Sequence, residues 1–111
     1  MTSHVRVDAG VCGFKTSATI RSEDSQHVEF DVQSDCGKIR GFAGALKKRG
    51  QIDAYQEISP VAESVVLTVA RETLTGCCAA CAVPVGLFKG MQVATGLALP
   101  QGISIGLEKD A

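Results

Sequence analysis

Polar and hydrophobic positions alternate along the first third of the chain, and a period of two predicts strands. Residues suited to a buried face occupy every second position in segments 5–9, 14–20 and 28–32. The link at residues 22–25 is short and polar, so an antiparallel hairpin joins the second and third strands. We therefore expect a sheet with one buried face and one face open to water.

The pattern changes to helical spacing after residue 35. Between Ile39 and Leu46, apolar residues fall at i, i+3, i+4 and i+7, which is the stripe of an amphipathic helix. Ser34 or Asp35 can cap the N-terminal amides of this helix, and Gly50 marks its end. The sequence therefore predicts a first helix between these signals.

Two glycines, Gly41 and Gly44, lie inside this first helix. Glycine is about 1 kcal/mol less favourable than alanine in a helix interior. We therefore expect another segment to approach this part of the helix closely.

Two more helices and a last strand are predicted in the second half of the chain. Ser59-Pro60 is typical of a helix start, with proline at the first helical position, and Gly76 is the expected stop. A third helix is expected to begin near Pro84 and to end near Gly96. Apolar residues alternate with polar or small ones over residues 103–107, which predicts a final strand.

The element order β-β-β-α-α-α-β predicts an α+β fold, an antiparallel sheet of three to four strands with three helices packed on one face. The 111 residues fit a single domain, residues 1–111. A formal net charge of −1, 5% aromatic residues and no tryptophan argue against nucleic acid or an anionic membrane as partner. The apolar runs are shorter than the roughly 20 residues of a membrane span, and no secretory signal is seen, so we expect a cytoplasmic protein.

The five cysteines are the unusual feature of the composition. An odd count without a secretory signal argues against a disulfide framework. Cys12 lies in the connection into the hairpin, Cys36 lies where the third strand gives way to the first helix, and Cys81 precedes the third helix. These are loops and helix starts, where a cysteine that packs as a small hydrophobe is not expected. A helix N-terminus favours the thiolate, the form that binds metal or attacks sulfur.

The spacing of the cysteines indicates a ligand set. Cys78 and Cys81 form a C-x-x-C, whose two sulfurs can reach one ion, and Cys12 and Cys36 would complete four thiolates. Cys77 is the alternative to Cys78 as the fourth ligand. Such a set suits an iron–sulfur cluster or zinc and disfavours magnesium or calcium. We therefore expect the sulfurs of these residues to gather at one end of the molecule.

Three hypotheses follow for the cysteines. The first, which we favour, is a protein that binds a metal or an iron–sulfur cluster and is not an enzyme. The second is a thiol-based sulfur carrier or redox protein, in which Cys81 or Cys36 accepts a persulfide and the C-x-x-C resolves it as a disulfide. The third is a non-catalytic structural protein with inert cysteines. His4 and His27 share strand parity with charged residues, so we expect both to face solvent.

The pairs Cys12-Gly13 and Cys36-Gly37, followed by Cys81, resemble in order the cysteine positions of the U-type iron–sulfur cluster assembly scaffolds, IscU and the N-terminal part of NifU. The similarity extends over roughly residues 10–97 and includes the element order. It implies the SufE/NifU architecture, a cluster held by these cysteines, and a sulfur donor or cluster acceptor protein as partner. The oligomeric state does not follow from it.

The chain departs from that family at three points. Phe14 stands where the family has Asp, Ala80 stands where it has His, and a Pro-Pro-Val-Lys type segment is missing before Cys81. In the family the Asp keeps the cluster labile, so Phe14 implies a cluster that is retained. The chain is also similar to a small microbial family without assigned activity that shares Cys-Gly-Phe and Cys-x-Val-Pro…Gly-Leu-Ala-Leu-Pro motifs.

Overall fold

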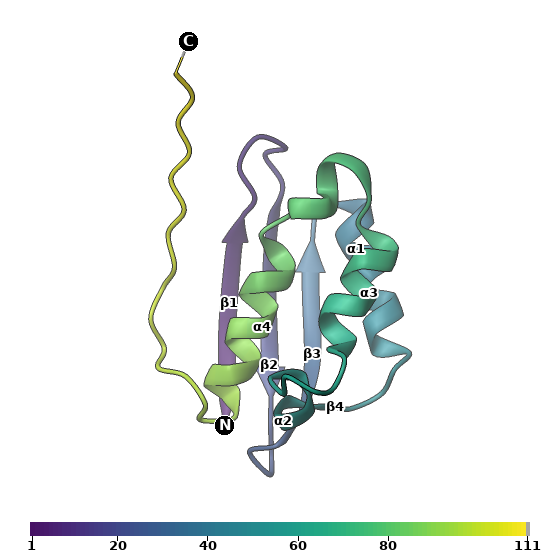
Figure 1. Ribbon diagram of the computed structural model, residues 1–111. Coiled ribbons are helices and arrows are strands. Elements are labelled where there is room, and N and C mark those ends of the chain that lie inside the picture. Colours follow the sequence, from purple (N-terminus) through teal and green to yellow (C-terminus); the bar gives the residue numbers. More distant parts are fainter. Residues whose placement is uncertain (111) are drawn as a thin grey trace.

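The framework of the protein is a four-stranded antiparallel sheet, seen in a computed structural model that describes residues 1–110 (Figure 1). The strands follow one another in space as they do along the chain, in the order β1-β2-β3-β4. Val5 pairs with Ala18, which in turn pairs with Val32, so the alternating pattern is in register across three strands. The strands are β1 Thr2–Asp8, β2 Lys15–Arg21, β3 His27–Ser34 and β4 Ile52–Asp53.

The longer helices pack on the sheet and on each other, which confirms the predicted α+β fold. Helix α4 lies against β1 and β2, α1 lies against β3, and α3 packs against both α1 and α4 (Figure 1). A short α2 follows β4 directly, and a 3-10 turn, η1, precedes α4. The helices are α1 Gly37–Lys47, α2 Ala54–Glu57, α3 Val65–Thr73, η1 Gly76–Ala80 and α4 Val83–Ala94.

The core lies between the sheet and these helices. Its largest fully buried side chains include Phe42 and Leu46 of α1 and Leu87 and Met91 of α4. On the opposite face of the sheet, the polar residues of β1, β2 and β3 are mostly exposed. The predicted alternation of a buried and an open face is therefore confirmed.

Helix α4 approaches β1 more closely than side chains on both elements would permit. A Cβ atom added at Gly90 would lie 2.4 Å from Val5 Cγ2 and 2.5 Å from Ile20 Cδ1, and one at Gly86 would lie 2.8 Å from Val7 Cγ2. The glycines therefore determine how α4 seats on the sheet. By contrast, a Cβ at Gly41 or Gly44 of α1 would meet nothing within 4 Å, so the close approach predicted there is wrong.

The predicted final strand at residues 103–107 is also wrong. Residues 99–110 are exposed, and no strand forms beyond α4 within the part of the chain that the structure describes. An alternating pattern makes a segment fit to be a strand, but a strand also needs a hydrogen-bonding neighbour. This tail runs clear of the sheet (Figure 1).

Two helix starts differ from the sequence prediction. Helix α3 begins after Ser64, whose Oγ accepts a hydrogen bond from the N–H of Leu67, and not at Ser59-Pro60. The residue at the N-cap of α1 is Cys36 rather than Ser34 or Asp35. The sequence prediction also omitted β4, α2 and η1, which are too short to show a period.

Residues 76–94 form the one segment, within residues 1–110, that is long and apolar enough by composition to cross a membrane. This segment is not one continuous α-helix, because it joins η1 to α4 and Cys81 between them has an extended ψ of 138°. Its helical part buries Leu87 and Met91 completely in the core. The segment is apolar because α4 packs directly on β1 and β2.

Candidate functional site

All five cysteines lie in three segments at one end of the sheet (Figure 1). The segments are the β1–β2 loop with Cys12, the junction of β3 and α1 with Cys36, and residues 75–82 with the other three. We call this the cysteine end. The topology explains it, because β1 and β3 run in the same direction and both finish there, and α4 starts there.

The cysteines differ in burial. Cys36, Cys78 and Cys81 are half-buried and pack against the core, whereas Cys12 and Cys77 are exposed. All five are free thiols. None of them belongs to the sixteen buried apolar residues that form the core within residues 1–110. The thiols therefore border the core without filling it.

Cys36 is held in place by hydrogen bonds of its backbone. Its N–H donates to Ser34 Oγ at 3.1 Å, and its carbonyl accepts from the N–H of Arg40 at 3.0 Å, the first turn of α1. Ser34 Oγ is in turn 2.7 Å from Thr16 Oγ1 on β2. The position of Cys36 thus depends on the sheet as well as on the helix.

Cys78 and Cys81 sit on two successive tight turns. The N–H of Cys78 donates to the Thr75 carbonyl at 3.2 Å, and the N–H of Cys81 donates to the Cys78 carbonyl at 3.1 Å. Gly76 has a φ of +63°, which lets the chain turn sharply out of α3. The C-x-x-C therefore lies between α3 and α4 on a short, defined turn.

The β1–β2 loop, by contrast, is a hairpin tip with few contacts. Gly10 and Gly13 have φ values of +86° and +72°, and the N–H of Gly13 donates to the Gly10 carbonyl at 2.9 Å. Val11 is fully exposed beside the exposed Cys12, and Phe14 at the end of the loop is 43% exposed. This loop is the part of the cysteine end that is least tied to the core.

No three His, Cys, Asp or Glu side chains within residues 1–110 lie close enough together to hold a metal ion. The cysteine end therefore brings the predicted ligands to one region but not into one ready coordination sphere. The assignment of Cys12, Cys36, Cys78 and Cys81 as ligands stays a prediction.

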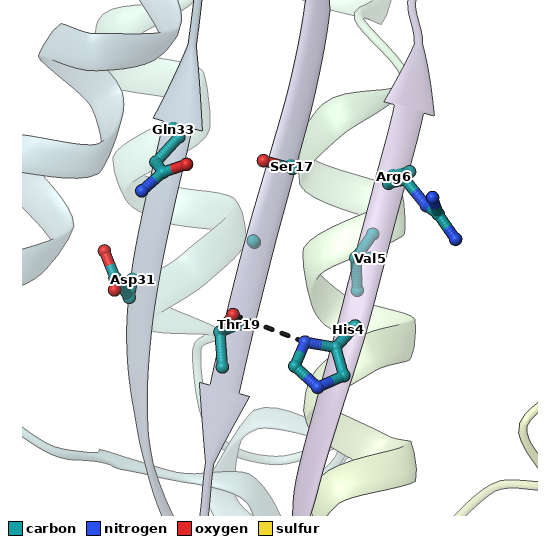
Figure 2. A pocket seen from close by; sticks show the side chains of 8 residues that line it. His4, Val5, Arg6, Ser17, Thr19, Asp31 and Gln33 are labelled. Carbon is teal, nitrogen blue, oxygen red and sulfur yellow. Dashed lines mark hydrogen bonds between the residues drawn. The ribbon is translucent and has the colours of Figure 1, made fainter.

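The open face of the sheet carries a second feature, a shallow polar hollow (Figure 2). His4, Thr19 and Asp31 lie side by side on β1, β2 and β3, and His4 Nδ1 is 3.4 Å from Thr19 Oγ1. Arg6 and Gln33 flank them. His4 is exposed, as its strand parity predicts. The hollow mixes donors and acceptors without a buried polar group aimed into it, so it indicates no particular ligand.

The opposite end of the molecule holds polar contacts that the sequence did not reveal. Asp24 accepts hydrogen bonds from the N–H groups of Gln26 and His27 and from His27 Nδ1 at 2.7 Å. The backbone and side-chain hydrogen bonds from His27 lower the pKa of Asp24. In return, the side-chain hydrogen bond to Asp24 raises the pKa of His27 above 6.5. This pair stabilises the β2–β3 turn and is only partly shielded from water.

Glu57 is a buried carboxylate with a structural role. Its oxygens accept hydrogen bonds from Ser64 Oγ at 2.8 Å, the N–H of Val65 at 2.6 Å and the N–H of Val66 at 2.8 Å. The N–H groups of Val65 and Val66 are among those that the first turn of α3 leaves without an intrahelical partner. Glu57 lies outside the spacing of a capping box, so no local motif could have identified it.

The comparisons with known proteins give one match. Residues 3–107 match the model of DUF6951, a family of unknown function. The chain belongs to this family. The matched segment contains all five cysteines and extends into the C-terminal tail. No curated protein and no solved structure matches the chain, and the resemblance to U-type scaffolds stays a prediction.

Proposed function

We propose that the chain binds a thiophilic metal ion or an iron–sulfur cluster at the cysteine end. The observation that carries this proposal is the distribution of the thiols, since every cysteine of the sequence lies in one of three segments that meet at one end. Packing does not account for this gathering, because no cysteine occupies a fully buried core position. Thiolate sets favour zinc and iron–sulfur clusters over hard cations.

The ligands we infer are Cys36, Cys78 and Cys81, with Cys12 as the fourth and Cys77 as the alternative to Cys78. The half-buried members already border the same core. Binding then requires the three cysteine segments to move closer together, the β1–β2 loop with the exposed Cys12 among them, because no three of these side chains lie close enough to hold an ion within residues 1–110. Coordination and local folding are commonly coupled in this way, because the ion supplies the energy that gathers its ligands.

Phe14 supports retention of a bound cluster rather than its transfer. Its ring is half-exposed at the end of the β1–β2 loop, next to the segment that carries Cys12. A phenyl ring provides no exchangeable oxygen ligand and limits the access of water. We therefore infer that a cluster stays bound when an acceptor protein is offered, and that Phe14→Asp permits transfer.

The test is metal analysis and absorption spectroscopy of protein purified without air, followed by reconstitution with zinc or with iron and sulfide. We expect stoichiometric binding by the unchanged chain, loss of binding in each of Cys12→Ser, Cys36→Ser and Cys81→Ser, and a smaller effect of Cys77→Ser than of Cys78→Ser. Circular dichroism of each metal-free variant is the control for folding. Stoichiometric binding by Cys12→Ser, Cys36→Ser and Cys81→Ser alike would overturn the proposal, as would absence of binding by the unchanged chain.

A second candidate function is favoured by the C-x-x-C itself, since Cys78 and Cys81 are free thiols on two successive turns between α3 and α4. Here the thiolate of Cys81 or Cys36 attacks the outer sulfur of a donor protein's persulfide, a new persulfide forms, and the donor thiolate leaves. Attack by a second thiolate of the C-x-x-C then gives a disulfide and releases hydrosulfide. A mass increase of one sulfur atom after mixing with a persulfide donor, absent in Cys81→Ser or in Cys36→Ser, would identify this activity and the residue that carries it.

A further inference from the structure

The C-terminal tail, residues 99–110, is an apolar segment without a partner. Leu99, Ile103, Ile105 and Leu107 are 80%, 53%, 67% and 91% exposed. The tail leaves the molecule near the N-terminal end of β1 and runs clear of the sheet (Figure 1). Its one backbone hydrogen bond within residues 99–110 is local, from the N–H of Gln101 to the Leu99 carbonyl. Such a segment is expected to be covered by a partner.

The sheet has one long edge that can accept a strand. Strand β1 pairs with β2 along all seven of its residues and has no strand on its other side in the part of the chain that the structure describes. It contains no proline and its pairing with β2 is continuous, so its outer N–H and C=O groups form a regular template. The other edge strand, β4, has only two residues. Beyond β4, residues 29–34 of β3 are also unpaired on that side, so the seven residues of β1 form the longest continuous open edge among residues 1–110.

We propose that two copies of the chain exchange tails, each tail adding to the β1 edge of the other copy as an antiparallel strand. The alternation of the tail fits this edge, because Ile103, Ile105 and Leu107 would all face the helix side, where Val5 and Val7 of β1 already point. This mode of strand addition uses main-chain hydrogen bonds for affinity and alternate side chains for specificity.

The chain's own β1 is the less favourable acceptor. The tail starts beside the N-terminal end of β1, so pairing within one copy would be parallel (Figure 1). Parallel pairs are slightly less stable per residue than antiparallel pairs. In the one parallel register that places Ile105 beside Val5, Glu108 also lies beside Asp8, which sets two like charges side by side. In the structure the tail does not pair with its own β1.

Antiparallel pairing with a second copy removes this conflict. The register that places Ile105 opposite Val5 then places Glu108 opposite Thr2. The apolar side of the added strand would lie next to α4, whose Val85 is 47% exposed and whose C-terminal neighbour Leu97 is 37% exposed. A reciprocal exchange is closed by a two-fold axis, so it yields a dimer and not a fibre.

The test compares the full-length chain with two tail variants under reducing conditions, by sedimentation equilibrium. We expect a dimer for the unchanged chain, a monomer for Ile105→Lys, and a dimer for the control Ser104→Lys, whose side chain would point to the open face. Both sites are exposed in the single copy, so neither substitution threatens the fold. Amide hydrogen exchange should show β1 protected in the dimer and losing protection in Ile105→Lys.

Three results would overturn the proposal. A dimer of unchanged mass in Ile105→Lys would show that the tail is not the contact. A monomeric unchanged chain whose β1 amides lose protection in Ile105→Lys would show that the tail docks on its own copy. A monomer without such a change would show that the tail covers nothing.

Discussion

The two ends of the sheet use their chemically active side chains in opposite ways. One end of the sheet carries the β2–β3 turn and α2. There the carboxylate oxygens of Asp24, Asp53 and Glu57 accept hydrogen bonds from backbone N–H groups. At the cysteine end, no sulfur takes part in any side-chain hydrogen bond found within residues 1–110. The first group stabilises turns and helix starts, whereas the second is left free by the fold.

This difference indicates where function is to be sought. Polar residues that are consumed by capping and turn formation are accounted for by stability, since they satisfy amide groups that would otherwise be unpaired. Thiols that border the core at one end, without filling it, are not accounted for in this way. Substitutions at the end with the β2–β3 turn should therefore lower the free energy of unfolding strongly, whereas substitutions at the cysteine end should lower it only slightly.

The largest effect is expected at Glu57. Glu57→Ala leaves the N–H groups of Val65 and Val66 without their acceptor in a buried place, which should lower the free energy of unfolding by about 3 kcal/mol. Urea denaturation measures this, and Glu63→Ala, an exposed carboxylate just before the α3 cap, is the matched control. Equal stability of the two variants would contradict the capping role.

A smaller effect is expected at Cys78. In metal-free protein, Cys78→Ser places a hydroxyl where a half-buried thiol packs against the core, which should cost about 1 kcal/mol. The same urea denaturation, followed by circular dichroism, gives the value. A loss as large as that of Glu57→Ala would mean that the cysteine end is as important to the fold as the opposite end, and would remove the distinction between them.

The contribution of His27 should depend on pH. Its pKa is raised in the folded state by the hydrogen bond to Asp24, so the stabilisation is fully present below pH 6.5 and is lost as the pH rises through the raised value. The pKa of Asp24 is lowered, so its part is present above pH 3.8 and is lost as the pH falls. The difference in Tm between the unchanged chain and His27→Gln should be largest between these two values. A difference in Tm that stays the same at all pH values would contradict this role of His27.

The smallest effect is expected at Cys77, which neighbours Cys78 in sequence but is exposed. Cys77→Ser should change the free energy of unfolding of metal-free protein by less than about 0.5 kcal/mol, as is usual for surface positions. Comparison with Cys78→Ser in one denaturation series tests the contrast within the cysteine end itself. A larger loss for Cys77→Ser than for Cys78→Ser would reverse the assignment of which thiol borders the core.

Parts of the candidate site could be read from the sequence. The alternating pattern and the helical stripes identify β1, β2, β3, α1 and α4, and so place Cys12 and Cys36 in connections and Cys81 ahead of α4. What the sequence lacks is the distance between these connections. Whether the thiols lie within reach of one ion depends on the hydrogen bonds and packing that fix each of these connections in place. The β1–β2 loop is the connection with the least contact with the core.

The glycines in the helices also show what the sequence alone does not reveal. Propensity alone treats Gly44 of α1 and Gly90 of α4 alike, but only the second lies against β1 at a distance that excludes a Cβ atom. The cap of α3 by Glu57 and the failure of the 103–107 segment to find a neighbour within its own copy are further cases. Each depends on whether separate elements of the fold come into contact, which no local pattern reports.

The sequence by itself determined the strands and helices with a clear period, the open polar face of the sheet and the positions of the cysteines between elements. Tertiary structure alone decided how α4 packs on the sheet at Gly86 and Gly90, where α3 begins, and that no three cysteine side chains within residues 1–110 lie close enough to hold one ion. The physical reason is that periodicity reports which side of a local element is buried, whereas caps, close approaches and shared ends are set by the packing of elements against each other.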